Sequence, residues 1–174
     1  IAYCSNLDSL AIAKKLGFEI HTGFSMNISN SLSVGVLESL DVKSLTLSPE
    51  LTIKDLANIS GRVPRGIIAY GRLPLMLTRN CPVRNGKTCQ DCKMNSYLTD
   101  RMGKKFPVVC NMGFSEILNS APIYMADRMS EIKNMDFVTF YFTKEKKETC
   151  EAIIEAYRKG IEMTYNQLKD ILNK

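Results

Sequence analysis

Four of the six cysteines in this 174-residue chain fall within one short segment, at Cys81, Cys89, Cys92 and Cys110. Their spacing is C-x7-C-x2-C-x17-C, with a C-x2-C pair at its centre. Thiolates are the ligands of structural zinc and of iron–sulfur clusters, and four of them complete either kind of site. The spacing alone favours zinc over an iron–sulfur cluster and leaves disulfides or unliganded thiols as further alternatives.

Basic residues surround these cysteines. Between Arg62 and Lys105 the chain has ten lysines and arginines against two acidic residues, although its net charge is only +5. A positive field of this kind suits an anionic partner, either RNA or an anionic small molecule, and a plain solvated surface is the alternative. Arg79 and Arg84, which flank the first cysteine, are the candidate substrate-binding residues of this basic belt.

The rest of the composition indicates a globular protein with no membrane partner. No apolar stretch approaches the roughly 20 residues of a membrane-spanning helix, and no signal peptide is visible. Nine methionines and clustered cysteines favour a reducing, cytoplasmic setting. The chain begins with Ile rather than Met, so we expect a fragment that works together with a missing N-terminal part of the same protein.

Helical and extended patterns alternate in the first part of the chain. We expect helices at 6–16, 29–40 and 52–59, and strands at 18–23, 42–47 and 65–73. Short units in this order are typical of right-handed crossovers in a parallel sheet. They fit part of a (β/α)8 barrel better than a complete doubly wound sheet. We therefore predict one α/β domain over residues 1–174, with a partial TIM-barrel-like fold.

Local signals place the ends and faces of these helices. Asn6 or Ser5 is the predicted N-cap of the first helix and Thr52 that of the third, where Asp55 would complete a capping box. In the second helix the predicted buried face consists of Leu32, Val36, Leu37 and Leu40.

The pattern changes at residues 74–113, which lack a helical period and contain several prolines and glycines. We predict an irregular Cys-rich insertion here, with a hairpin formed by 97–100 and 106–109. After it, the sequence predicts an amphipathic helix at 121–135, a strand at 137–142 and helices at 146–159 and 164–172.

Several stretches then resemble one known family. They are YGRLPLMLTRNCPV, the paired cysteines, DRMGKKFPVVCN and EILNSAPIYMADRMSEI, with HTGFSMNISNS and LTLSPELT upstream. On these motifs, which extend from Phe18 to Thr143, the chain resembles peptidase family U32, whose members are described as collagenase-like and bacterial proteases.

The resemblance implies a barrel-type domain and a four-iron–four-sulfur cluster held by Cys81, Cys89, Cys92 and Cys110. It also implies iron–sulfur-dependent hydroxylation of RNA, or of a quinone precursor, as the chemistry. Many members have a His-Gly pair where this chain has Tyr70-Gly71, so no role of that histidine is carried over.

Polar residues after two predicted strands are the other site candidates. Glu50 follows a strand end, which is the active face of a barrel, so we expect a catalytic role or a cap on the next helix. Asn27 and Asn30, at the preceding strand-to-helix junction, are candidates for binding polar groups of a substrate or for capping.

A hydrolytic apparatus is hard to find in the sequence. His21 is the only histidine, and we expect it to be structural, with a Cys–His dyad to Cys81 or Cys110 as the alternative. No Gly-x-Ser-x-Gly or His-Glu-x-x-His motif is present. Three hypotheses remain: an iron–sulfur-dependent RNA-modifying enzyme, a genuine peptidase, and a zinc-pinned module that binds RNA or protein.

Overall fold

The computed structural model describes residues 1–84, 88, 96–111, 113–132 and 134–159. They fold into an α/β structure that divides into two compact units. The first unit consists of 1–69 and 125–140, and the second of 70–124 and the described residues from 141 on. Each unit is described by itself.

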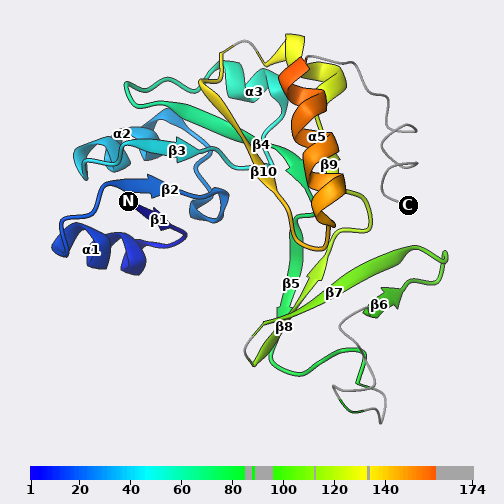
Figure 1. The fold of residues 1–174 in the computed structure, drawn as a ribbon. Helices are drawn as coiled ribbons and strands as arrows, with labels where there is room; N and C mark the ends of the chain where they lie inside the picture. Colours follow the sequence, from blue (N-terminus) through cyan, green and yellow to red (C-terminus); the bar gives the residue numbers. More distant parts are fainter. Residues whose placement is uncertain (85–87, 89–95, 112, 133, 160–174) are drawn as a thin grey trace. The chain divides into compact units, whose positions relative to one another are not determined.

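Parallel strands in sequence order form the first unit (Figure 1). They are β1 Ala2–Cys4, β2 Ile20–Thr22, β3 Ser44–Thr46 and β4 Arg65–Gly71, and each pairs in parallel with the next. The prediction of a parallel α/β sheet is confirmed.

Two further strands complete this sheet. Strand β10 (Phe137–Tyr141) lies next to β4, and β9 (Ile123–Tyr124) pairs with β4 antiparallel. The sheet of the described residues is open and does not close into a barrel.

The helices of the first unit begin where their caps predict. They are α1 Leu7–Lys15, α2 Ser31–Ser39 and α3 Ile53–Ala57, with a 3₁₀ helix, η1, at Phe24–Met26. The Asn6 side chain caps α1, and Thr52 and Asp55 form the predicted capping box of α3. Each cap supplies an acceptor for a backbone N–H that has no partner inside the helix.

The buried face of α2 differs from the prediction. Val34 and Leu37 are buried, whereas Leu32 and Val36 are 85% and 59% exposed. Apolar residues occur on two overlapping faces of this helix, so periodicity alone could not choose between them. Packing in the core cluster with residues of α1 and β3 decides which face is buried.

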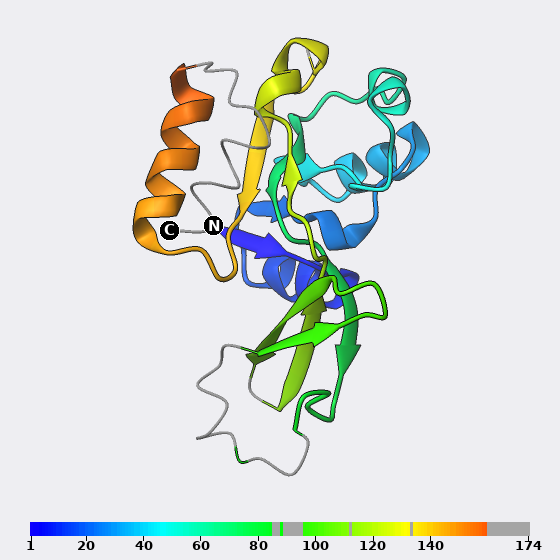
Figure 2. The same cartoon turned by 90° about the vertical axis from the view of Figure 1, so that its right-hand side faces the viewer.

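Among the described residues of 74–118 four strands form a regular sheet, where the sequence predicts an irregular insertion with one hairpin. Four antiparallel strands lie in the order β5-β8-β7-β6 (Figures 1 and 2). They are β5 Pro74–Thr78, β6 Ser96–Thr99, β7 Lys105–Asn111 and β8 Phe114–Leu118. The predicted hairpin is confirmed by the pairing of β6 with β7.

The prediction of an α-helix at 121–135 is wrong. Ile123 and Tyr124 pair with Gly71 and Tyr70 in the sheet, so their backbone groups are not free to begin a helix. Residues Ala126–Glu131 form a 3₁₀ helix, η2, instead. The apolar residues that suggested an α-helix recur every third position, which is the period of a 3₁₀ helix.

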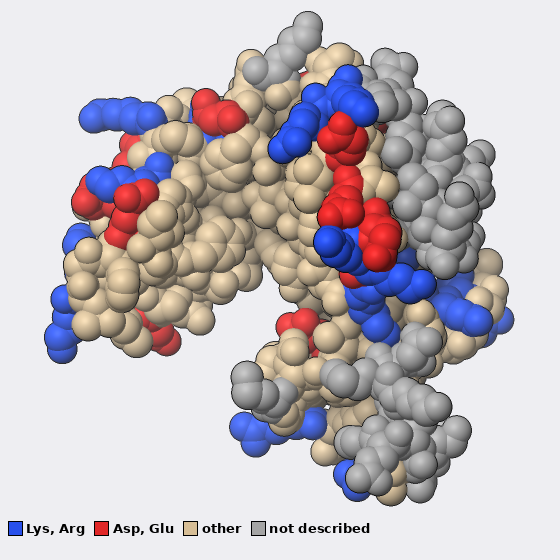
Figure 3. Space-filling model, in the orientation of Figure 1, with Lys and Arg blue, Asp and Glu red and all other residues tan. Residues whose placement is uncertain are grey.

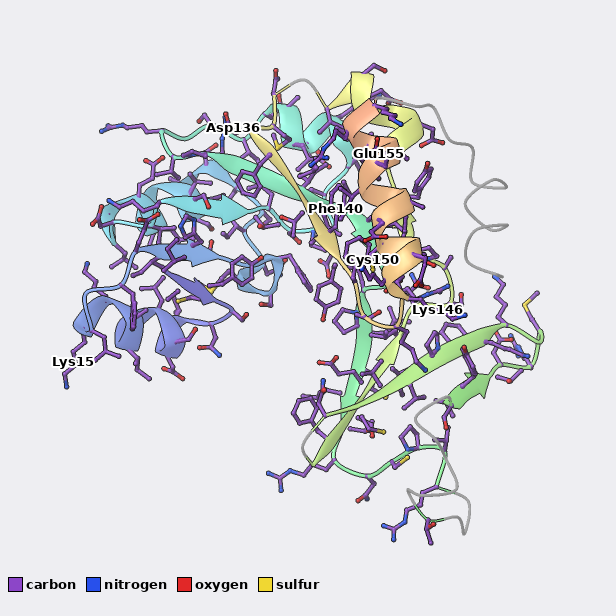
Figure 4. The ribbon with its side chains drawn as sticks, viewed as in Figure 1. Lys15, Asp136, Phe140, Lys146, Cys150 and Glu155 are labelled. Carbon is purple, nitrogen blue, oxygen red and sulfur yellow. The ribbon has the colours of Figure 1, made fainter. Side chains whose placement is uncertain are left out.

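One long helix, α5 (Lys147–Lys159), follows β10 as predicted and buries Ile153 and Ala156. Cys150 lies in its first turns, close to Lys146 (Figure 4). The helix predicted at 164–172 is outside the described residues. Among the helices that are described, none combines the length and the apolar character that crossing a bilayer requires.

Candidate functional site

The antiparallel sheet of the second unit brings the ends of the cysteine segment together. Ser115 on β8 pairs with Cys110 on β7 at one side and with Thr78 on β5 at the other. Its hydroxyl lies 3.6 Å from Cys110 Sγ. Since Cys81 comes three residues after Thr78, the middle strand β8 sets the spacing between the two cysteines.

A short turn holds Cys81 at the end of β5. The Arg84 N–H donates to the Cys81 carbonyl at 3.3 Å, across Pro82 and Val83. Proline at the second position of a turn presets the backbone for this reversal. This turn therefore positions the Cys81 backbone at the end of β5.

Cys81 and Cys110 line one open pocket of about 430 Å³. The pocket is formed by the end of β5, the turn after it and the hairpin between β7 and β8. Its lining residues are Arg79, Asn80, Cys81, Arg84, Cys110, Asn111, Gly113, Phe114 and Ser115.

The charge of this pocket is positive. Arg79 and Arg84 are exposed and line it, and the lining contains no carboxylate among the residues that the structure describes. Basic side chains also lie along the lower end of the four-stranded sheet in Figure 3. The structure thus places Arg79 and Arg84 beside Cys81 and Cys110, and their role in substrate binding stays a prediction.

The structure describes only part of the predicted four-cysteine set. Cys81 and Cys110 lie in one pocket, whereas Cys89 and Cys92 lie outside the described residues. Cys4, Cys81, Cys110 and Cys150 are free thiols. Within the described ranges, no three His, Cys, Asp or Glu side chains come close enough to hold a metal ion.

Two of the predicted polar residues meet at the carboxyl end of the parallel strands. Ser48 donates a 2.6 Å hydrogen bond to Asn27 Oδ1 and accepts one from the Glu50 N–H at 3.4 Å. A parallel bridge between Ile28 and Leu47 holds the two loops in register. Ser48, which the sequence analysis did not single out, is the residue that links them.

The third predicted polar residue, Asn30, is the N-cap of α2. Its Oδ1 accepts the Ser33 N–H at 2.9 Å, which is an ordinary N-cap. Glu50 does not cap α3, because Thr52 and Asp55 form that capping box, and its side chain is exposed. Glu50 therefore remains available for another role.

His21 lies in a three-residue cluster that the sequence analysis missed. Its Nδ1 is 2.7 Å from Ser44 Oγ, and its Nε2 is 3.0 Å from Glu19 Oε1. His21 and Ser44 are register partners on β2 and β3, which explains why residues far apart in sequence meet. Only knowledge of the strand register could have revealed this group.

Tyr70, at the end of β4, is completely buried. Its hydroxyl donates to Glu145 Oε1 at 3.0 Å, and Glu145 Oε2 accepts the N–H groups of Thr143 and Lys144. Burial, followed by the nearby Glu145 charge, raises the pKa of Tyr70. The tyrosine therefore stays protonated and serves as a hydrogen-bond donor.

Comparison with known proteins gives one match. The model of the family described as Peptidase family U32 matches residues 4–172, nearly the whole chain. No curated protein matches the chain significantly, and neither does any solved structure.

Proposed function

Because the chain belongs to peptidase family U32, we propose that it is part of an enzyme that hydroxylates RNA with the help of an iron–sulfur cluster. In this proposal Cys81, Cys89, Cys92 and Cys110 hold a four-iron–four-sulfur cluster. The single observation that carries the proposal is the shared pocket of Cys81, Cys110 and two arginines.

The described residues fit such a group by their donor chemistry. Both thiols are free, and both lie at a half-buried surface that a cluster could reach. The other two thiols, Cys89 and Cys92, come between β5 and β6 in the sequence and lie outside the described residues. Arg79 and Arg84 supply positive charge that offsets the negative charge of four thiolates.

The residues of the chain have separate tasks in this proposal. Arg79 and Arg84 attract and hold phosphate groups of the RNA. The Cys81–Arg84 turn and the pairing of β7 with β8 keep the two thiols in place before any ligand binds. When bound, a cluster of this type supplies one-electron redox chemistry. Zinc would suit the same thiols but would not supply it.

The carboxyl end of the parallel strands is the second part of the proposal. We infer that the parallel unit is a portion of a barrel, in which this end is the active face. Asn27 and Glu50, linked through Ser48, would bind polar groups of the substrate or act on it. A reducing, cytoplasmic setting belongs to the proposal as well, because the thiols must stay unoxidised.

Nucleoside analysis tests the activity. The protein is produced in cells whose RNA lacks hydroxylated nucleosides, and the RNA is digested and examined by mass spectrometry. We expect a nucleoside heavier by one oxygen atom with the wild type, and none with Cys81→Ser or Cys110→Ser. Cys150→Ser, a free thiol on α5, is the control and should retain the product. An unchanged nucleoside profile with the wild type would contradict the proposal.

Peptide hydrolysis is the second candidate function, and one observation favours it. Ser44, His21 and Glu19 have the order and spacing of a nucleophile, a base and an orienting carboxylate. However, the cluster lies at the amino end of the strands, and Ser44 is the first residue of β3. In barrels that end supports stability, whereas catalytic residues lie at the other end, so we rank this function second.

A fluorophosphonate probe separates the two candidates, because it labels activated serines. Two results together would favour the peptidase. The wild type would hydrolyse peptides and be labelled by the probe, and Ser44→Ala and His21→Gln would lose the label. Ser33→Ala is the matched control on the exposed start of α2. If the wild type is not labelled, the Ser44 cluster is structural.

A further inference from the structure

Phe114 adds an exposed aromatic ring to the pocket that contains the cysteines and arginines. The Phe114 residue is 36% exposed, and it lines the same pocket as Arg79 and Arg84. An exposed aromatic side chain next to two guanidinium groups offers a flat apolar surface and two phosphate-binding groups in one place.

The local backbone fixes this ring at the edge of the pocket. Phe114 is the first residue of β8 and pairs with Asn111, the last residue of β7. The tight connection between the strands passes through Gly113, whose φ of 95° is a conformation that glycine adopts without strain. Phe114 therefore lies at the start of β8, next to the Cys110–Ser115 pair of the hairpin.

We propose that this pocket binds one unpaired nucleotide of a single-stranded RNA, with its base stacked on Phe114 and its phosphates held by Arg79 and Arg84. The inference rests on the proposed RNA-directed function and adds the residue that selects unpaired bases. It concerns binding alone and involves no chemical step.

The lining of the pocket supports a nucleotide bound next to the proposed cluster. Phe114, Arg79 and Arg84 line the same open pocket as Cys81 and Cys110. Asn80 and Asn111 add amide groups that can donate to and accept from a base edge. The described lining contains no carboxylate, and Arg79 and Arg84 are the side chains there that attract a phosphate.

Stacking is what makes the site selective for single strands. In a duplex each base is already stacked and paired, so the Phe114 ring would have no free face to contact. Phosphates are equally present in both forms of RNA, and the arginines alone would not distinguish them. Selectivity for the single strand should therefore depend on Phe114.

The first test uses anaerobically prepared protein and a fluorescein-labelled single-stranded RNA dodecamer, with the same strand annealed to its complement for comparison. We expect Phe114→Ala to weaken single-strand binding by about 5- to 150-fold, the range of one base stacked on an aromatic ring. Phe114→Tyr should bind as tightly as the wild type. Phe18→Ala, an exposed phenylalanine in the other unit, is the matched control and should change nothing.

The salt dependence of binding separates stacking from charge. Arg79→Ala and Arg84→Ala should each lower the slope of log affinity against log salt by about 0.7, which corresponds to one phosphate of a single strand. Phe114→Ala should leave this slope unchanged while lowering affinity.

A second measurement reports the contact directly. The chain contains no tryptophan, so Phe114→Trp introduces one emitter at the proposed site. Its fluorescence should be quenched when the RNA strand is added, because a stacked base quenches indole emission, whereas Phe18→Trp should not respond. A nucleoside monophosphate in place of the strand should give the same quenching at higher concentration.

Equal binding of single strand and duplex, or an unchanged affinity of Phe114→Ala together with an unquenched Phe114→Trp, would overturn the inference. These outcomes are independent of the proposed redox function, since the colour and iron content of the same protein samples are measured separately. RNA binding that needs the arginines but not Phe114 would assign the pocket to phosphate alone.

Discussion

The Tyr70 hydroxyl donates a 3.0 Å hydrogen bond to the Glu145 carboxylate, and that carboxylate also accepts two backbone N–H groups just before α5. A buried side chain at the end of β4 is thereby tied to the start of a helix more than seventy residues later in the chain. This hydrogen bond should contribute to the stability of the fold.

Tyr70→Phe should lower the free energy of unfolding by ~1–3 kcal/mol, because Glu145 Oε1 loses its buried donor. Urea unfolding at neutral pH measures the loss. Tyr3→Phe, at a 57% exposed position, is the control and should remain within experimental error of the wild type. If the two variants are equally stable, the hydrogen bond contributes nothing.

Tyr70 should also make the free energy of unfolding depend on pH in the alkaline range. Burial raises the pKa of Tyr70 in the folded protein above the value of about 10 for an unfolded chain. Above that pH the unfolded state loses a proton that the native state keeps, so stability is full below about pH 10 and falls as the pH rises. Relative to the wild type, Tyr70→Phe should flatten the fall in unfolding free energy above pH 10. Parallel pH curves for the two proteins would contradict this.

Gly71, the residue after Tyr70, should tolerate no side chain. Its φ is 143°, and an added Cβ would meet the Tyr141 backbone. Gly71→Ala should therefore destabilise the protein by ~1–3 kcal/mol. Gly35→Ala is the matched control, because that glycine lies inside α2 with open space around it and should stabilise by about 0.5–1 kcal/mol. Thermal unfolding distinguishes the opposite signs.

Glu38 on α2 should make the first unit sensitive to acid. Its carboxylate accepts the N–H of Arg62 and of Val63, and these bonds hold the pKa of Glu38 below its usual value. Stability from this group is present above the unfolded pKa of about 4.3 and is lost as the pH falls through the lower folded pKa.

Glu38→Gln removes the titrating group. The variant should be less stable than the wild type at neutral pH, and the difference should shrink below pH 4 or so. Chemical denaturation across this range measures it, with Glu148→Gln on the exposed side of α5 as control. A stability difference that is constant with pH would show that the charge is not involved.

Local signals in the sequence predicted much of this fold because each of them acts over a few residues. The caps Asn6 and Thr52 and the hairpin of β6 and β7 depend only on near neighbours. The buried face of α2 and the short strand β9 depend on distant partners. The predicted face was right for Leu37 and wrong for Leu32 and Val36, and a helix was predicted where β9 lies. A helical period is equally compatible with α and 3₁₀ geometry when the apolar residues recur every three positions.

The sequence alone could indicate the type of site, but it could not identify every residue that belongs to it. The cysteines and arginines are conspicuous in the sequence, and the structure places Cys81, Cys110, Arg79 and Arg84 around one pocket. Phe114, Ser44 and Ser48 carry no sequence signal, because their roles come from strand register. Cys89 and Cys92 lie outside the described residues, and their part in the site stays a prediction.

The central claim is that the four cysteines hold an iron–sulfur cluster, and anaerobic purification tests it most directly. The wild type should be brown, with a broad absorption shoulder in the visible range and about four iron atoms per chain. Cys81→Ser and Cys110→Ser should lose the colour, whereas Cys150→Ser should keep it. A colourless wild-type protein that carries one zinc ion per chain would contradict the account.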